Sequence, residues 1–215
     1  MLGIARPIKL CRTLAYHCHA IGLAGRRYPG VHLGSGGLRI DGFLNVDADF
    51  AIDCDVVART ERLKLPRGSV GCIYASHLFE HVERRRMPDV LKNWFDTLQP
   101  GGKLYLCVPD FEILARLYLE TLPACTTEAG CQKIDLITRV IYGGQTDSFD
   151  FHFFGYSLTT MRVWLEAAGF TDVRRFDRAG LTFAAFRDGG YASFDDVLIS
   201  LNVEATRPAV FVTSV

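Results

Sequence analysis

Two segments near the start of the chain carry residues that could bind a nucleoside. Val31–Gly37 has the pattern of a short strand that runs into three glycines within four positions. Glycines let the backbone turn sharply and let a ligand approach the main chain with no Cβ in the way. Leu44–Asp47 has the pattern of a second strand that ends on an acid, and in a doubly wound sheet such a carboxylate binds ribose hydroxyls. The pair predicts half of a nucleoside site, with an ordinary turn as the alternative.

Imidazole and carboxylate groups form a second set of candidates. His77, Glu80 and His81 are spaced i, i+3, i+4, which would place them on one face of a helix. Such a trio could hold a metal, but no fourth ligand follows nearby, and hydrogen bonds that fix the adjacent loop are the favoured alternative. His152 lies within the aromatic run Phe149–Tyr156, which could be a pocket wall or ordinary core.

These groups need strands and helices to position them, and the hydrophobic pattern supplies both. The expected strands are 31–33, 43–47, 52–57, 70–75, 103–108, 173–176 and 197–204, and the expected helices are 7–23, 80–98, 111–122, 134–142 and 157–168. Strands that alternate with helices predict a parallel sheet covered on both faces. The linker 38–42 is too short for a crossover helix, so we expect a turn or two of helix there.

The length of 215 residues fits one domain, which we expect to span 1–215 with a lead-in helix in 1–29. The segment 111–156 is far longer than an ordinary loop, and such insertions are usually functional, so it is predicted to be a cap over the substrate. The lead-in helix and this insertion both offer apolar faces that could pair two copies into a homodimer.

Charge and cysteine content narrow the class of protein. Lys plus Arg equals Asp plus Glu, 24 each, which argues against nucleic acid or an anionic membrane as a partner. The chain has seven cysteines, an odd number with no two-residue spacing, which is typical of a reducing compartment. No stretch approaches the roughly 20 apolar residues that span a bilayer. The cytoplasm is therefore the expected location.

Several motifs, taken in chain order, resemble those of class I S-adenosylmethionine (SAM)-dependent methyltransferases. They are Leu33-Gly34-Ser35-Gly36, Asn45-Val46-Asp47, Leu65-Pro66, Tyr74-Ala75-Ser76-His77, Glu80-His81-Val82, Leu98-Gln99-Pro100-Gly101-Gly102, Val108-Pro109-Asp110 and Ala167-Ala168-Gly169-Phe170. The resemblance covers about residues 30–178. It is strongest to small, type 11-like methyltransferases with a Ser-His-x-x-Glu-His element and a Val-Pro-Asp strand end, which are associated with polysaccharide and glycan biosynthesis.

This resemblance implies a Rossmann-like α/β fold, with a mostly parallel seven-stranded sheet, an antiparallel last strand and helices on both faces. It implies SAM as cofactor, bound across the carboxyl ends of the strands. The implied cofactor-binding residues are Gly34, Ser35, Gly36, Asp47, Ala48, Glu61, Ser76 and His77. Two departures stand out: the third glycine of the turn is displaced to Gly37, and Glu61 is assigned to the adenine only by counting back from Leu65-Pro66.

Methyl transfer to an oxygen needs an acceptor about 3 Å from the methyl carbon and a group that removes its proton. His152 is the first candidate for this base, since an imidazole titrates near neutral pH. Asp110 is the second candidate, either as a base or, with Glu112 and Asp150, as a ligand of a magnesium ion. The resemblance favours a small carbohydrate acceptor. The residues expected to contact it are Asp150, Phe154 and Tyr156.

Sugar O-methylation by a SAM-dependent enzyme is thus the expected function. The alternatives are an NAD-dependent oxidoreductase that uses the same glycine turn and acid, and a non-catalytic module that binds SAM. Against the oxidoreductase stand the glycine spacing and the short linker 38–42.

Overall fold

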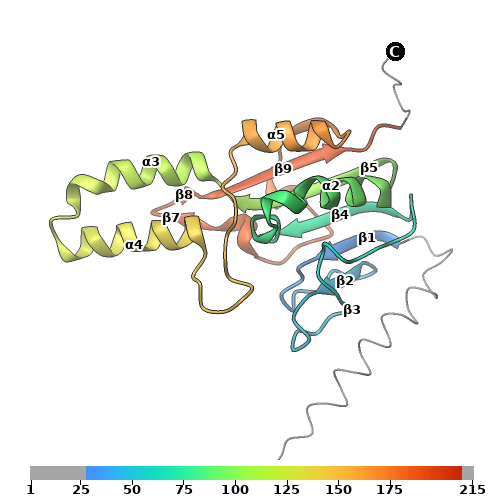
Figure 1. Ribbon diagram of the computed structural model, residues 1–215, viewed down its shortest axis with the longest axis horizontal. Coiled ribbons are helices and arrows are strands. Elements are labelled where there is room, and N and C mark those ends of the chain that lie inside the picture. Colours follow the sequence, from blue (N-terminus) through green and yellow to red (C-terminus); the bar gives the residue numbers. More distant parts are fainter. Residues whose placement is uncertain (1–27, 210–215) are drawn as a thin grey trace, which may run out of the picture.

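Seven strands form one sheet at the centre of the molecule (Figure 1). The structure, a computed structural model, describes residues 28–209, so the predicted lead-in helix lies outside the described residues. The spatial order is β3 (Val56–Val57), β2 (Leu44–Asp47), β1 (Tyr28–Leu33), β4 (Val70–Ser76), β5 (Leu98–Pro109), β9 (Ser200–Thr206) and β6 (Thr171–Arg175). In this sheet β9 is antiparallel to both neighbours and the other neighbouring pairs are parallel. The predicted fold class is confirmed.

One face of the sheet packs against two helices, α2 (Met87–Thr97) and α5 (Leu158–Ala167). Alternate strand residues point to this face because side chains in a strand alternate between its two sides. The buried residues they meet recur at helical spacing. The shared core includes Val31, Leu33, Ile73, Ala75, Leu104 and Leu106 from the strands, and Val90, Leu91, Trp94, Met161 and Leu165 from the helices. Ser157 caps α5 through a reciprocal hydrogen-bond pair with Thr160, which fixes where that helix begins.

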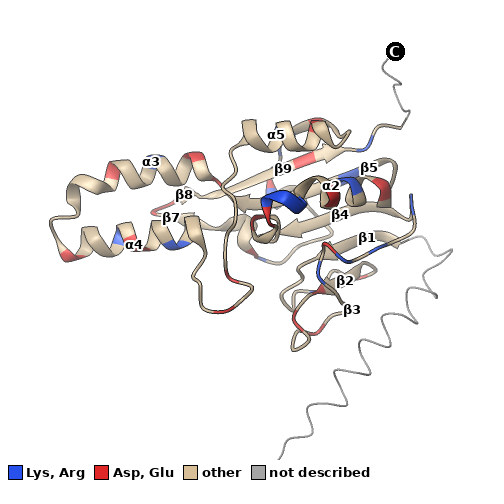
Figure 2. Ribbon diagram, viewed as in Figure 1, with Lys and Arg blue, Asp and Glu red and all other residues tan. Residues whose placement is uncertain are grey.

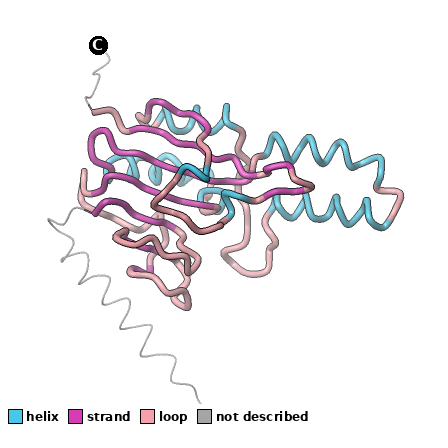
Figure 3. The backbone as a smooth tube through the Cα atoms, turned by 180° about the vertical axis from the view of Figure 1, so that it is seen from behind, coloured by secondary structure: helices cyan, strands magenta, loops and turns pink. Residues whose placement is uncertain are grey.

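The opposite face is covered, within the described residues, by the segment that follows β6 (Figure 3). It contains two 3₁₀ turns, η4 (Arg178–Gly180) and η5 (Gly189–Tyr191), followed by the small hairpin β7 (Ser193–Phe194) and β8 (Val197–Leu198). Arg178 is 2% exposed and its guanidinium carbon lies 5.1 Å from the ring centre of Tyr74 on β4. Asp188 accepts hydrogen bonds from Arg178, so the buried cation has a counter-charge.

Residues 111–142 form a helical hairpin that extends from one side of the sheet (Figure 1). Its helices are α3 (Phe111–Thr121) and α4 (Glu128–Tyr142), joined through η3 (Leu122–Ala124). Leu114 and Ile137 pack between them in a cluster of their own. Leu119 and Leu136 are 67% and 52% exposed. The predicted cap and the predicted homodimer stay predictions.

Several elements differ from the sequence-based prediction. The strand expected over 197–204 is divided at Ile199, so that β8 pairs with β7 and only β9 joins the central sheet, and the helix expected over 134–142 begins at Glu128. The helix expected over 80–98 begins only at Met87, because Val82 and Glu83 adopt extended backbone angles after the 3₁₀ turn η1 (Phe79–His81), and a second 3₁₀ turn, η2 (Arg84–Arg86), follows. The strand expected over 52–57 is reduced to two residues. Its acid, Asp55, accepts a hydrogen bond from the backbone N–H of Asn45 at 2.8 Å, a side-chain bond in place of a ladder bond.

The linker between β1 and β2 contains turns and no helix, which is even less than the turn or two expected. Acidic and basic residues are scattered over the ribbon, and the longest basic run, Arg84–Arg86, comes just before α2 (Figure 2). None of the helices that the structure describes has the length and apolar character needed to cross a membrane.

Candidate functional site

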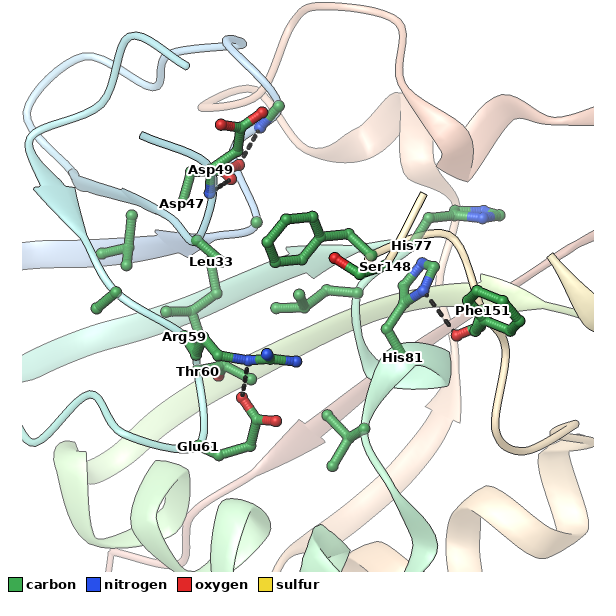
Figure 4. Close-up of a pocket in the computed structure, with 18 of the residues that line it drawn as sticks. Leu33, Asp47, Asp49, Arg59, Thr60, Glu61, His77, His81, Ser148 and Phe151 are labelled. Carbon is green, nitrogen blue, oxygen red and sulfur yellow. Dashed lines mark hydrogen bonds and ion pairs between the residues drawn. The ribbon is translucent and has the colours of Figure 1, made fainter. Parts of the chain in front are cut away.

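A cavity of about 340 Å³ lies at the carboxyl ends of β1, β2 and β4 (Figure 4). Ligands of open α/β sheets bind at this edge, and pockets for small molecules start at about 300 Å³. Six residues predicted from the sequence line it: Gly34, Gly36, Asp47, Ala48, Glu61 and His77. They come from segments far apart in the chain, so the fold brings together the larger part of the predicted cofactor set.

The glycine turn forms the floor of this cavity. Gly34, Gly36 and Gly37 have φ angles of +64°, +54° and +84°, a region where residues other than glycine are strained. A Cβ on Gly34 would lie 3.1 Å from Leu78, whereas a Cβ on Gly36 would meet no protein atom within 4 Å. The main chain at Gly36 is therefore accessible from the cavity, so a ligand can approach it closely.

Asp47 is held in place by the turn it faces. Its Oδ2 accepts a hydrogen bond from the N–H of Gly36 at 2.8 Å, and its Oδ1 accepts one from the N–H of Asp49 at 2.9 Å. A carboxylate has about four acceptor positions, so two remain for the vicinal hydroxyls of a ribose. The residues present thus fit the nucleoside part of the implied cofactor.

The wall beyond β3 carries Arg59, Thr60 and Glu61. Nε of Arg59 lies 3.8 Å from a carboxylate oxygen of Glu61, whose side chain is only 12% exposed. Thr60 is buried and accepts a hydrogen bond from Nε1 of Trp94 at 3.2 Å, which anchors this segment to α2. Glu61 is placed as expected for an adenine ligand, and that role stays a prediction.

The opposite end of the cavity is formed by histidines that follow β4 (Figure 4). His77 has a φ of +49° and comes from a turn, so the expected helix face does not exist. Its Nδ1 nevertheless lies 3.3 Å from Oε1 of Glu80, and its Nε2 lies 3.3 Å from Oγ of Ser200. Burial alone would lower the pKa of His77, but the Glu80 carboxylate outweighs this and raises it above its ordinary value.

Glu80 and two further imidazoles extend this end of the site. Burial raises the pKa of the Glu80 carboxyl, but His77, His81 and His152 together outweigh burial and hold the pKa below its ordinary value. His81 lines the cavity, and His152 stands behind it with ring centroids 4.8 Å apart. Burial lowers the pKa of His152. The predicted base therefore lies next to the cavity but does not line it.

The remaining predicted residues lie elsewhere than expected. Ser35 is buried beneath the turn and, like Ser76, is not among the lining residues. Asp110 is buried, its Oδ1 caps α3, and its Oδ2 accepts a hydrogen bond from Arg175 at 2.8 Å, so both oxygens are engaged away from the cavity. Tyr156 is fully buried.

Two acceptor residues predicted from the aromatic run are also displaced. Asp150 closes the turn at 144–146 by accepting hydrogen bonds from Gly144 and Thr146, and Phe154 packs against Trp164 of α5. Phe149, Phe151 and Phe153 line the cavity instead. The period of the run put alternate rings on opposite sides, and the sequence alone did not say which side faces the cavity.

Several lining residues were not predicted: Asp49, Arg59, Thr60, Val82, Glu83, Asp147 and Ser148. A usable signal existed for Asp49 and Arg59, since both come two residues after the end of a strand, where a parallel sheet gathers its ligands. Asp147 and Ser148 lie in the loop that follows the C-terminus of α4, and no local pattern indicates that this loop reaches the cavity.

A larger hollow of about 660 Å³ lies between α2 and α5. Its lining includes Arg67 before β4 and Gly169 before β6, so it is at the amino ends of the parallel strands. Its lining contains no histidine and none of the residues predicted to bind the cofactor. We therefore place the functional site at the smaller cavity, where the sheet directs its ligands.

Comparisons with known proteins identify the family and the fold. A family model described as "Methyltransferase domain" matches residues 40–175. The fold is similar to that of a SAM-dependent methyltransferase from Mesorhizobium loti, with 16% identity, a TM-score of 0.51, and coverage of 90% of this chain and 98% of that chain. It is also similar to a possible histamine N-methyltransferase from Thermotoga maritima, with 15% identity, a TM-score of 0.50, and 92% of each chain covered. No curated protein matches the sequence.

Proposed function

Because the chain belongs to the methyltransferase-domain family of class I SAM-dependent enzymes, we propose that it transfers a methyl group to a hydroxyl of a small carbohydrate. Methyltransferase activity follows from the family; the hydroxyl and the carbohydrate are the proposal. The family match also decides against the NAD-dependent alternative. SAM supplies a methyl group on a sulfonium, and the protein has to bind it, hold the acceptor in line and let a proton leave.

The observation that carries the binding of SAM is the pairing of Gly36 with Asp47. The carboxylate that would bind the ribose is already oriented by the N–H of the glycine over which the ligand would pass, at 2.8 Å. Such preorganisation lowers the cost of binding, because the groups need no reordering when the ligand arrives.

The proposed acceptor end is built from rings and hydroxyl-binding groups. Phe149, Phe151 and Phe153 line the cavity, yet they are 46%, 40% and 53% exposed, so their faces are available to a ligand. Aromatic faces pack against the apolar C–H faces of a sugar, while Asp147 and Ser148 beside them can bind its hydroxyls. The guanidinium carbon of Arg59 lies 5.7 Å from the Phe149 ring centre, which ties this loop to the cofactor side.

An acceptor hydroxyl at this end would lie on the histidine side of the cavity, where His77 and His81 contribute to the lining. His152 stays the candidate for the general base only when no metal is bound to it: its ring contacts that of His81, which lines the cavity, and does not line the cavity itself. Replacement of His152 by Gln is expected to lower turnover far more than affinity for the cofactor.

Two measurements test the proposal in sequence. Calorimetry with S-adenosylhomocysteine is expected to show one site per chain, with NAD as the negative control. Radiolabelled methyl transfer from SAM to a panel of mono- and oligosaccharides, with amines and carboxylic acids as comparison acceptors, is then expected to label the sugars. Binding of NAD and not of S-adenosylhomocysteine would contradict the family reading of the site. Labelling of amines alone would refute the hydroxyl acceptor and leave methyl transfer standing.

A further inference from the structure

Glu80, His81 and His152 bring one carboxylate and two imidazoles together beside the cavity. One potential ligand atom from each lies within 4.8 Å of the others. Among residues 28–209, no other group of three or more His, Cys, Asp or Glu side chains is gathered closely enough to hold a metal ion. The residues come from η1 and from the segment that follows α4, so the grouping is a product of the fold and not of local sequence.

The two imidazoles present free nitrogens. Nδ1 of His81 lies 3.0 Å from the carbonyl oxygen of Phe151, and Nδ1 of His152 lies 2.9 Å from that of Val140. A carbonyl can only accept, so each Nδ1 donates its hydrogen, and in the neutral imidazole each Nε2 then keeps its lone pair. Imidazoles that bind metals commonly have this arrangement, in which the second nitrogen is tied to a carbonyl or carboxylate.

Glu80 supplies the anion, and only one of its two carboxylate oxygens faces a partner, His77. Its side chain is 1% exposed, and neither carboxylate oxygen accepts a hydrogen bond of proper geometry from the described residues. Oε1 lies 3.3 Å from Nδ1 of His77, which leaves Oε2. A buried carboxylate oxygen without a hydrogen bond is costly, and Oε2 belongs to a side chain grouped with two imidazoles, so a cation bound there would satisfy it.

The backbone holds these groups in place without any ion. The N–H of Phe153 donates to the carbonyl of Glu80 at 2.8 Å, and the N–H of His152 donates to that of Tyr142 at 3.0 Å. The segment that carries His152 is therefore attached on one side to η1 and on the other to α4.

We propose that Glu80, His81 and His152 bind a divalent transition-metal ion through one carboxylate oxygen and two Nε2 atoms. Two imidazoles with one carboxylate suit Mn²⁺, Fe²⁺, Co²⁺ or Zn²⁺, whereas Mg²⁺ prefers oxygen ligands alone. The carboxylates expected for magnesium do not assemble: Asp110 caps α3 and Asp150 closes its own turn. Three protein ligands leave open positions for water or a substrate oxygen.

The role of the ion, unlike the site, rests on the proposed function. His81 lines the cavity, so an ion on this residue borders the acceptor end. A hydroxyl bound to the ion loses its proton to solvent more readily. The C–O bond then forms as the S–CH₃ bond breaks, the electron pair returns to sulfur, and the products are a methyl ether and S-adenosylhomocysteine.

Metal binding can be measured without any turnover. The full chain, stripped with a chelator and dialysed, is titrated with Co²⁺ and followed by its visible d–d absorption and by metal analysis after gel filtration. One Co²⁺ per chain is expected, together with a rise in the melting temperature. Equimolar Mg²⁺ should not displace it.

Three variants locate the ion. Glu80→Gln, His81→Gln and His152→Gln are each expected to weaken Co²⁺ binding at least about 100-fold, since even changes behind the ligands cost 10–100-fold. Glu120→Gln, which alters an exposed carboxylate on α3, is the matched control and should bind normally. Thermal unfolding of the metal-free variants shows whether each is folded.

Absence of the Co²⁺ band in the wild type, or undiminished binding in folded His81→Gln and His152→Gln, would overturn the site. The two proposals fail separately. If the chain binds S-adenosylhomocysteine but not Co²⁺, the metal site is refuted and the proposed methyltransferase function is not. If the chain binds Co²⁺ but methylates sugars equally well after the metal is removed, the metal site stands and its role in methyl transfer is refuted.

Discussion

Replacement of Gly36 by Ala tests whether the open space above the glycine turn is where the cofactor binds. At a φ of +54°, Ala is strained by about 1–2 kcal/mol, of which about 0.4–1 kcal/mol is offset by the reduced entropy of the unfolded chain. The net loss of about 1 kcal/mol lowers the melting temperature of a chain this long by about 3 °C. The new Cβ meets no protein atom within 4 Å, so it enters space left for a ligand.

The matched control is Gly68→Ala. Gly68 has a φ of +62°, a Cβ there would also meet nothing within 4 Å, and its N–H also donates a hydrogen bond, to Asp96 at 2.9 Å. It lies before β4, at the amino end of the sheet, and does not line the cavity. The two variants should lose similar stability, and only one should lose affinity.

Calorimetry with S-adenosylhomocysteine and thermal unfolding of the same samples separate these effects. Gly36→Ala is expected to lower affinity at least about tenfold, equivalent to about 1.4 kcal/mol, and Gly68→Ala to leave it within about twofold. Unchanged affinity in both variants would refute the reasoning, because the cofactor could then not pass over Gly36. Equal losses would show that the effect is general destabilisation.

Three further predictions follow from the same structure. Asp47→Asn removes the charge that would bind the ribose diol, so affinity for S-adenosylhomocysteine should fall about 30-fold, or about 2 kcal/mol, by calorimetry, with little change in melting temperature. Phe149→Ala should raise KM for the sugar acceptor and leave the affinity for S-adenosylhomocysteine unchanged. A change in that affinity with KM unaltered would contradict the assignment of Phe149 to the acceptor end of the cavity. Burial raises the pKa of Asp55, but Arg39 and Asn45 outweigh it and hold the pKa below its ordinary value. Its stabilisation is therefore present above the unfolded-state pKa of about 4 and lost as pH falls through the lower folded value, and Asp55→Asn should flatten that acid limb in urea unfolding.

Local pattern predicted the parts of the fold that depend on local forces. Apolar runs bounded by Gly-rich turns predicted β1 and β4 within a few residues, whereas β5, expected over 103–108, begins at Leu98. The acid at the end of β2 lines the cavity, as predicted. The pattern predicted the wrong extent for one strand and one helix, where side-chain bonds and turns interrupt the regular backbone. The side chain of Asp55 accepts from the backbone N–H of Asn45 just before the two-residue strand β3, and extended residues after η1 delay the helix expected from residue 80 until Met87.

The sequence by itself determined the fold class, the glycine turn and the acid facing it, because these depend on backbone conformation and on the alternation of strands and helices. Only the tertiary structure decided which residues of the aromatic run face the cavity, that Asp110 is an interior cap, and that His152 joins Glu80 and His81. These outcomes depend on contacts between segments some 70 residues apart, such as Phe151 with His81, and no local periodicity specifies them.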